Sequence, residues 1–255
     1  MEDLNYGNWI HRKVLWLLGM ITLGLGILTV LPIPVPIRIV FGSLGFGSLI
    51  SLLYPLYSYY MFSPEGGNLQ EKFYSLILKN LENPDHGKIL DIGTGNGILA
   101  IKAAMLFPTA DVTGVDYWGK DWEYSKAVSE QNARIAKVSE RIIFCKGNAA
   151  ALNYPDGTFD AVVSNLTFHE VKSVKRKSDI LREALRVVKP GGNFVFIDQF
   201  YDESYYSDTE EFEVMLRGLK LTQITLKPLN EVLAFPKLLR HSKALGKTGI
   251  IFGKK

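Results

Sequence analysis

Two long apolar runs occupy the N-terminal quarter of the chain. Residues 14–37 contain no charged side chain, and residues 39–64 contain none either. A helix needs about 20 predominantly apolar residues to cross the hydrocarbon core of a bilayer. Both runs are longer than that, so they predict two transmembrane helices, over about 14–31 and 39–62.

Alternating prolines separate the two expected helices: Pro32, Pro34 and Pro36. Proline lacks a backbone donor and disfavours helix at the residue before it, so we expect a tight, extended turn here. The two helices would then form a hairpin. Arg12 and Lys13 precede the first helix, and the positive-inside rule therefore keeps the N-terminus, and the chain after the second helix, in the cytoplasm.

Two other interpretations of this region stay open. A cleaved signal peptide would need a small-residue cleavage site near the end of the first run, where none is clear. A hairpin lying in the membrane surface would have a similar composition. We expect a membrane anchor over residues 1–63, with the bilayer as its partner, followed by a separate domain over residues 64–255. Residues 59–68 join them, either as a lid over the second domain's site or as a flexible linker.

Strand-like and helix-like runs alternate after the anchor. The expected strands cover residues 88–91, 111–115, 142–145, 159–164, 194–197, 221–226 and 249–252, and the expected helices cover 98–107, 122–138 and 180–188. This alternation predicts an α/β fold, with a mainly parallel sheet and helices on both of its faces. In such sheets ligands bind beyond the carboxyl ends of the strands.

A glycine-rich turn follows the first expected strand, in the sequence DIGTGNG over residues 91–97. Glycines permit a tight turn and a close approach of the backbone to a ligand, and the following helix presents free amides. The dinucleotide fingerprint needs a further glycine where this chain has Ile98. Asp116, at the end of the second expected strand, can accept hydrogen bonds from both hydroxyls of a ribose. The pattern indicates a nucleoside-containing cofactor that is not a dinucleotide.

Two further motifs follow in order: FDAVVSN over residues 159–165 and REALRVVKPGG over residues 182–192. Together with the glycine turn and Asp116, they cover about residues 85–200 and resemble the class I S-adenosylmethionine-dependent methyltransferases of type 11. Residues 116–125 and 164–170 are also similar to a membrane-anchored prokaryotic subgroup. The resemblance implies a Rossmann-like sheet, S-adenosyl-L-methionine as the cofactor and methyl transfer as the reaction.

The resemblance also implies a set of cofactor-binding residues. It assigns the methionine part of the cofactor to Asp91, Gly93 and Gly95, the ribose to Asp116, the adenine to Tyr117, Asn148 and Ala149, and the path of the methyl group to Asn165. Thr94 and Gly97 of the same turn complete the set of cofactor-binding residues. Asn148 stands where this family usually has an acidic residue, although its oxygen can still accept a hydrogen bond. For Asn148 and Asn165 a simple turn role stays open.

His169 and Glu170 follow the fourth expected strand and should therefore lie near the sulfonium. An imidazole there could take a proton from a hydroxyl, phenol or amine acceptor, because its pKa lies near the working pH. It could equally do no more than hydrogen-bond the wall of the pocket. We carry His169 and Asn165 as candidate catalytic residues, and expect residues 201–239 to supply much of the acceptor pocket.

Composition excludes several other classes. Cys145 is the single cysteine and the four histidines lie far apart, so neither a disulfide nor a metal site is expected. A net charge of +3 gives no reason to expect nucleic acid. No tyrosine has a lysine four residues later, which excludes a short-chain dehydrogenase.

Because the anchor would confine the site to a membrane, we expect a small, lipophilic or membrane-associated methyl acceptor. A methyltransferase for a soluble small molecule or protein stays open. So does a membrane protein that binds S-adenosylmethionine without catalysis.

Overall fold

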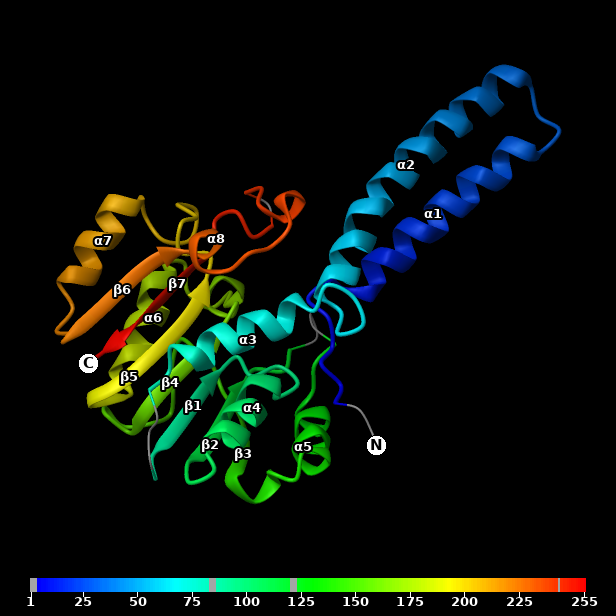
Figure 1. The fold of residues 1–255 in the computed structure, drawn as a ribbon. Coiled ribbons are helices and arrows are strands. Elements are labelled where there is room, and N and C mark those ends of the chain that lie inside the picture. Colours follow the sequence, from blue (N-terminus) through cyan, green and yellow to red (C-terminus); the bar gives the residue numbers. More distant parts are fainter. Residues whose placement is uncertain (1–3, 83–85, 120–122, 243) are drawn as a thin grey trace. The chain divides into compact units, whose positions relative to one another are not determined.

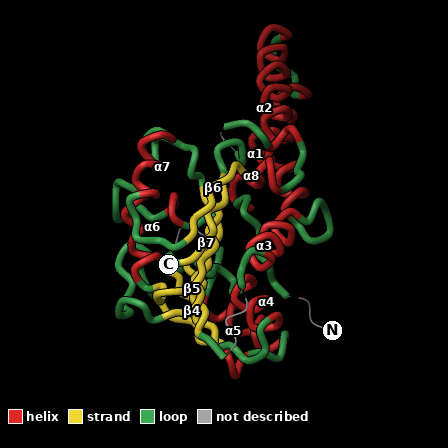
Figure 2. The backbone as a smooth tube through the Cα atoms, turned by 60° about the vertical axis from the view of Figure 1, so that its left-hand side comes forward, coloured by secondary structure: helices red, strands yellow, loops and turns green. Residues whose placement is uncertain are grey.

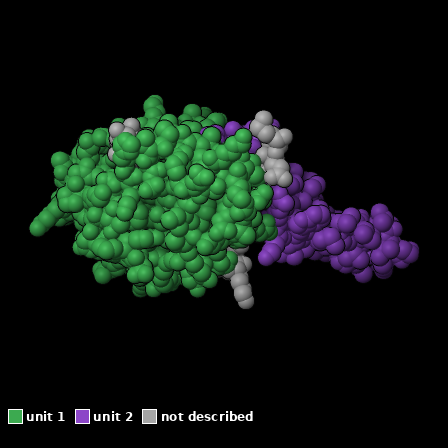
Figure 3. All heavy atoms as spheres, turned by 90° about the horizontal axis from the view of Figure 1, so that it is seen from below, with its two compact units in different colours: residues 1–6, 72–255 green, residues 7–71 purple. Residues whose placement is uncertain are grey.

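The computed structural model describes residues 4–82, 86–119, 123–242 and 244–255. The chain divides into two compact units, residues 7–71 and residues 1–6 with 72–255 (Figure 3). The smaller unit therefore extends a little beyond the anchor expected over residues 1–63. Residues 4–6 belong to the larger unit, although they precede the apolar helices in sequence.

The smaller unit is a pair of apolar helices, α1 (Arg12–Val30) and α2 (Val35–Phe62) (Figure 1). Both are long and apolar enough to cross a membrane by length and composition, with mean hydropathy of 1.9 and 1.7. The hydroxyls of Thr22 and Ser48 join them by a hydrogen bond of 2.8 Å. The helices also approach closely at Gly45, where an added Cβ would lie 3.4 Å from that of Leu25.

Helix α2 begins four residues earlier than the sequence pattern predicted, at Val35 instead of 39. The expectation of an extended turn through Pro36 is therefore wrong. Proline is tolerated in the first turn of a helix, because the amide that it lacks would have no partner inside the helix there. The connection shortens to the residues around Pro32, and Pro34 becomes the N-cap.

The larger unit is built on a seven-stranded sheet with strand order β3-β2-β1-β4-β5-β7-β6 (Figure 1). Its strands are β1 (Lys88–Ile92), β2 (Asp111–Asp116), β3 (Ile142–Lys146), β4 (Phe159–Asn165), β5 (Val188–Asp198), β6 (Gln223–Pro228) and β7 (Gly249–Lys254). The first five pair in parallel, and β7 runs antiparallel to β5 and β6. The expected Rossmann-like α/β fold is confirmed.

Helices cover both faces of this sheet. They are α3 (Leu69–Lys79), α4 (Ile98–Leu106), α5 (Lys126–Ile135), α6 (Lys177–Arg186), α7 (Thr209–Arg217) and the short α8 (Leu229–Val232), with 3-10 turns at Ser139–Arg141, Phe168–Glu170 and Lys237–Leu239. Figure 2 shows α6 and α7 on one side of the strands and α3, α4 and α5 on the other. The sheet is buried between them, and the strand residues Ile89, Val162 and Phe196 are fully enclosed.

Several element boundaries differ from the sequence pattern. Helix α5 begins at Lys126, because the Ser125 hydroxyl caps it by accepting the Val128 amide at 3.3 Å. The earlier start expected at Trp122 lies outside the described residues. Strand β5 already begins at Val188, so the helix before it ends at Arg186. Helices α3 and α7 had no counterpart in the expected set.

Candidate cofactor and acceptor site

The expected site residues meet at the carboxyl ends of β1, β2 and β4. Strand β1 lies between the other two, with Ile92 opposite both Val115 and Ser164. The chain leaves β1 toward β2 on one side, whereas β4 is its neighbour on the other side. Ligands of open α/β sheets bind at such a change of direction. The glycine turn, Asp116 and Asn165 therefore share one edge of the sheet.

The glycine turn is fixed to the end of β2. The amides of Gly93 and Thr94 both donate to the carbonyl of Val115, at 2.7 and 3.1 Å. Gly93 and Gly95 have φ of +76° and +56°, in the left-handed region that favours glycine. A Cβ added to Gly93 would overlap the side chain of Thr167. Position 93 therefore requires glycine for its backbone conformation and for the space around it.

Asp116 connects this turn to the following loop. One carboxylate oxygen accepts the Gly95 amide at 2.8 Å, and the other accepts the Trp118 amide at 2.8 Å. The indole nitrogen of Trp118 donates in turn to the Gly95 carbonyl at 2.9 Å. Each carboxylate oxygen has a second lone pair and can still accept a ribose hydroxyl. The carboxylate is thus held in position and retains capacity for a ligand.

Asp91 is almost completely buried beneath the turn, with 1% of its surface exposed. Burial raises the pKa of Asp91 to about 7, with Asp116 adding to the rise and the hydrogen bond from the Thr94 hydroxyl, at 2.7 Å, opposing it. A carboxyl group with this pKa is close to half ionised at neutral pH. The ammonium group of an amino-acid ligand would favour its ionised form.

The adenine-side candidates differ from one another. Tyr117 is 66% exposed, with the Lys146 ammonium 5.4 Å from the centre of its ring. Ala149 is buried beside Asn148. The Asn148 oxygen accepts the Ala150 amide at 3.0 Å, which closes a local turn. This contact favours the turn role for Asn148, whereas the exposed Tyr117 ring is free to stack on a planar ligand.

Asn165 ends strand β4 with an unsatisfied group. Among the described residues, its side-chain oxygen is buried and has no hydrogen-bond partner. Leaving a buried acceptor unpaired costs about 1–3 kcal/mol, so such atoms are uncommon in folded proteins. A ligand group that donates a hydrogen bond would remove this cost. The chemistry of the edge thus fits a ribose, an ammonium group and one further donor.

His169 lies between two carboxylates. Its Nδ1 is 3.0 Å from Asp198 and its Nε2 is 3.4 Å from Glu170. Burial opposes the charged form of the imidazole, but the Asp198 and Glu170 carboxylates outweigh it and raise the pKa of His169 to about 10. At neutral pH the ring is therefore protonated and has no free lone pair. Its surroundings favour the pocket-wall role over that of a general base.

Asp198 is a site residue that the sequence pattern did not single out. It is buried at the end of β5 and accepts the amides of Phe168 and Gln199, both at 2.7 Å. It thereby fixes the turn that carries His169. The signal was present, because Asp198 ends a buried strand as Asp116 and Asn165 do.

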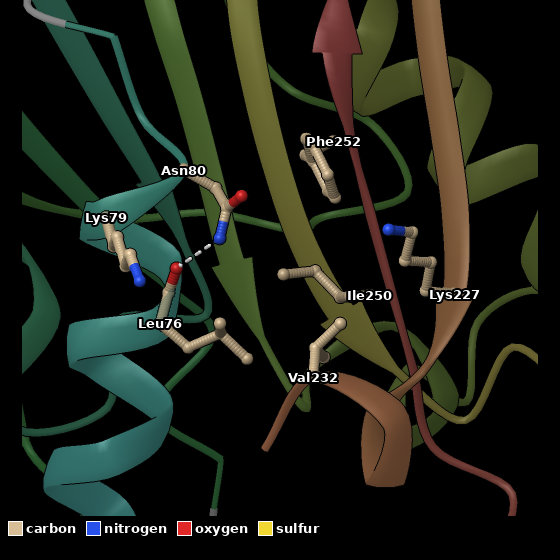
Figure 4. Close-up of a pocket in the computed structure, with 7 residues that line it drawn as sticks. All are labelled: Leu76, Lys79, Asn80, Lys227, Val232, Ile250 and Phe252. Carbon is tan, nitrogen blue, oxygen red and sulfur yellow. Dashed lines mark hydrogen bonds between the residues drawn. The ribbon is translucent and has the colours of Figure 1, made fainter.

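A cavity of about 250 Å³ lies elsewhere on the sheet, between α3 and the strands β6 and β7 (Figure 4). Figure 4 shows apolar side chains on its inner surface and the ammonium groups of Lys79 and Lys227 on opposite sides. None of the candidate cofactor residues lines it. This cavity is therefore separate from the edge that carries Asp116 and the glycine turn.

Comparison with known proteins identifies the domain. Residues 90–196 match the family described as a methyltransferase domain. The chain contains a class I methyltransferase domain. The matched residues extend from β1 into β5 and include the motifs that resembled this family.

Curated relatives are 27% to 35% identical to this chain over the residues that match. A ubiquinone/menaquinone biosynthesis C-methyltransferase of Geotalea daltonii is 27% identical over 48% of this chain and 49% of its own length. An arsenite methyltransferase of Aquipseudomonas alcaligenes is 30% identical over 51% and 38% of the two lengths. A demethylmenaquinone methyltransferase of Symbiobacterium thermophilum is 35% identical over 45% and 42%. The match therefore spans half or less of each relative.

Solved structures share the fold. Geranyl diphosphate C-methyltransferase of Streptomyces coelicolor superposes with a TM-score of 0.52 at 15% identity, over 73% of this chain and 79% of that one. The [4+2]-cyclase SpnF superposes with a TM-score of 0.51 at 19% identity, over 72% and 79%. A cyclase on this fold means that the architecture alone does not define the reaction.

The close contact at Gly93 gives a first testable expectation. Gly93→Ala should lower the free energy of unfolding by about 3 kcal/mol, because the new methyl group adds steric overlap to a strained φ. Gly191→Ala is the matched control, since Gly191 has φ of +78° and no described atom within 4 Å of the added Cβ. It should cost about 1 kcal/mol. Chemical denaturation measures both, and equal losses would show that the Thr167 contact is unimportant.

The charge on His169 gives a second testable expectation. Because its folded pKa of about 10 exceeds the ordinary value of 6.5, the charged ring stabilises the fold fully below pH 6.5, and this is lost as pH rises through about 10. His169→Gln should therefore lose about 3 kcal/mol at pH 7 and much less near pH 10. Denaturation across this pH range tests it, with the exposed His241→Gln as control. A loss that does not vary with pH would contradict the protonated state.

Proposed function

We propose that this protein transfers a methyl group from S-adenosyl-L-methionine to a small, lipophilic acceptor at a membrane surface. The observation that carries the proposal is the Asp116 carboxylate, held by the Gly95 amide beside a glycine turn that opens onto helix α4. S-adenosylmethionine has a ribose and an amino-acid end. The Asp116 carboxylate can accept hydrogen bonds from the ribose hydroxyls, and the Asp91 carboxylate can pair with the ammonium group of the amino-acid end. The methyltransferase family of residues 90–196 supports the same cofactor.

The reaction needs little from the protein besides alignment. A nucleophilic atom of the acceptor attacks the methyl carbon in line with the sulfonium, the carbon–sulfur bond breaks, and S-adenosylhomocysteine leaves. Any proton on the acceptor passes to a base or to water. Since His169 is protonated at neutral pH and its charge is offset by the Asp198 and Glu170 carboxylates, we assign it to the pocket wall.

The Tyr205 ring lies 5.7 Å from the His169 ring and extends this wall. Tyr205 belongs to the segment 201–239 that was expected to supply the acceptor pocket. Phe200, Tyr206 and Phe212 of the same region pack together behind it, with ring centres 5.1 to 5.9 Å apart. An aromatic wall of this kind suits a flat, apolar acceptor.

A lipophilic acceptor is supported by two further observations. Among the relatives are methyltransferases named for quinones and, in Aspergillus fumigatus, for sterols. Two helices of this chain are long and apolar enough to span a bilayer. The arsenite methyltransferase among the relatives supports the alternative of a soluble acceptor, for which the helices would set location only.

The path of the chain supports the proposed membrane arrangement. The backbone of Asn5 is hydrogen-bonded to Asn132 within the larger unit, and the chain re-enters that unit at Lys72. An anchor that begins and ends on the same unit crosses the membrane an even number of times. With Arg12 and Lys13 before α1, the positive-inside rule supports a cytoplasmic catalytic domain.

Methyl transfer can be followed with labelled S-adenosylmethionine, offering membrane lipids and soluble metabolites as separate acceptor pools. We expect label in the lipid pool. Asp116→Asn should weaken cofactor binding about 30-fold, because charged hydrogen bonds contribute roughly 1.5–3 kcal/mol. Asp111→Asn, at the opposite end of β2, is the matched control. Label in the soluble pool alone would refute the lipophilic acceptor, and cofactor binding without any transfer would favour the non-catalytic alternative.

Labelling of single cysteines in intact cells tests the topology. In a Cys145→Ser background, Ile33→Cys lies between the two helices and Glu65→Cys lies after the second. An impermeant maleimide should label Ile33→Cys from outside and Glu65→Cys only after lysis. If neither is labelled from outside, the hairpin lies in the inner surface. A mature chain that lacks its first residues would instead show a cleaved signal peptide.

A further inference from the structure

A short segment that precedes the apolar helices is hydrogen-bonded to the glycine turn and to helix α5, at the edge of the sheet that carries Asp116. We call this edge the cofactor edge. The Asn5 amide donates to the side-chain oxygen of Asn132 at 2.8 Å, and the Asn5 carbonyl accepts from the side-chain nitrogen of Asn132 at 2.9 Å. The same carbonyl accepts the side-chain nitrogen of Asn96 at 3.1 Å. Three hydrogen bonds thus join one backbone unit to two asparagines. We call residues 4–6 the strap.

Both asparagines are deeply buried, with 4% of Asn96 and 1% of Asn132 exposed. A buried amide without its partners costs about 1–3 kcal/mol, so these side chains depend on the strap. Asn132 also donates to the Asn96 carbonyl at 2.9 Å. It therefore links the strap to the glycine turn from its position on α5.

Asn96 lies inside the glycine turn, between Gly95 and Gly97. Its side-chain oxygen accepts the Ser125 amide at 3.4 Å, at the start of α5. The Ser129 hydroxyl donates to the Gly95 carbonyl at 2.9 Å. The turn that holds Asp116 through the Gly95 amide is thus supported from behind by α5 and by the strap.

The strap also has an aromatic contact. The Tyr6 ring lies 6.4 Å from the Tyr74 ring of α3, and the Lys102 ammonium lies 5.9 Å from the centre of the Tyr6 ring. These contacts fix the residue that follows Asn5 on the same unit. Six residues of chain separate Asn5 from Arg12, where α1 begins.

We propose that the strap and the positioning residue Asn132 hold the glycine turn in its cofactor-binding shape. Cofactor affinity then depends on chain that precedes the anchor in sequence. The inference rests on S-adenosylmethionine being the cofactor, but it concerns residues that touch neither the cofactor nor the acceptor in that proposal.

The test uses the full chain in lipid nanodiscs and two variants. Asn132→Leu keeps a side chain of similar size and removes all the hydrogen bonds of that side chain. Asn5→Pro removes the backbone amide that the strap donates, together with the Asn5 side chain, and keeps the carbonyl. The neighbouring Gln131→Leu, on the exposed side of α5, is the matched control. Calorimetry gives the cofactor affinity. Hydrogen exchange of residues 93–97 without cofactor reports the shape of the turn.

We expect both variants to bind S-adenosylmethionine about ten-fold more weakly, with faster exchange in the turn, and the control to match wild type. If the strap only stabilises the fold, the variants would have lower thermal stability but unchanged cofactor affinity and unchanged hydrogen exchange in the turn. A folded Asn5→Pro variant with wild-type affinity and wild-type exchange would overturn the proposal, even if Asn132→Leu does not fold. If wild type itself does not bind the cofactor, the proposed function fails, and exchange in the turn still decides the role of the strap.

Discussion

The hydrogen bond from the Gly95 amide to the Asp116 carboxylate is the contact on which the cofactor edge depends. It joins the turn after β1 to the end of β2, and so makes one surface from two strands. A hydrogen bond from an amide to a carboxylate is short and strong. The left-handed conformation of the glycines orients the Gly95 amide toward the Asp116 carboxylate. Without it, only the Val115 carbonyl, which accepts the Gly93 and Thr94 amides, would hold the turn to the end of β2.

The charges around His169 also offset one another. Three ionisable groups, His169, Glu170 and Asp198, lie together and partly buried, which is costly unless their charges offset each other. The imidazolium between two carboxylates meets that condition and leaves a net negative charge on the group. The two carboxylates therefore keep the His169 ring protonated. Any catalytic role of His169 would begin from a ring that is already charged.

Strands and motifs were predictable because they depend on local sequence. Buried parallel strands appear as short apolar runs, and the glycine turn with Asp116 has a fixed spacing, so the fold class and the cofactor edge could be predicted before any coordinates. Helix α7 was missed, although the Asp208 carboxylate caps it by accepting the Glu211 amide. The start of α2 was misjudged because proline was treated only as a helix breaker.

Other features depend on contacts between distant residues. Asn5 and Asn132 are 127 positions apart, and each has an ordinary local sequence, so only the folded chain shows that they pair. The same holds for His169 and Asp198, which are 29 positions apart. The imidazole pKa could not be predicted from a motif, since a histidine after a strand is compatible with either protonation state until its partners are known.

The unequal lengths of the two apolar helices have a consequence of their own. At 1.5 Å per residue, the 19 residues of α1 extend roughly 28 Å and the 28 residues of α2 roughly 42 Å. A hydrocarbon layer of about 30 Å matches α1 and leaves more than two turns of α2 uncovered. That excess carries Tyr57, Tyr59 and Tyr60, whose rings favour the headgroup layer. In a bilayer, the last turns of α2 would therefore lie in the headgroup layer, and the helix would carry the chain clear of the hydrocarbon before α3 begins.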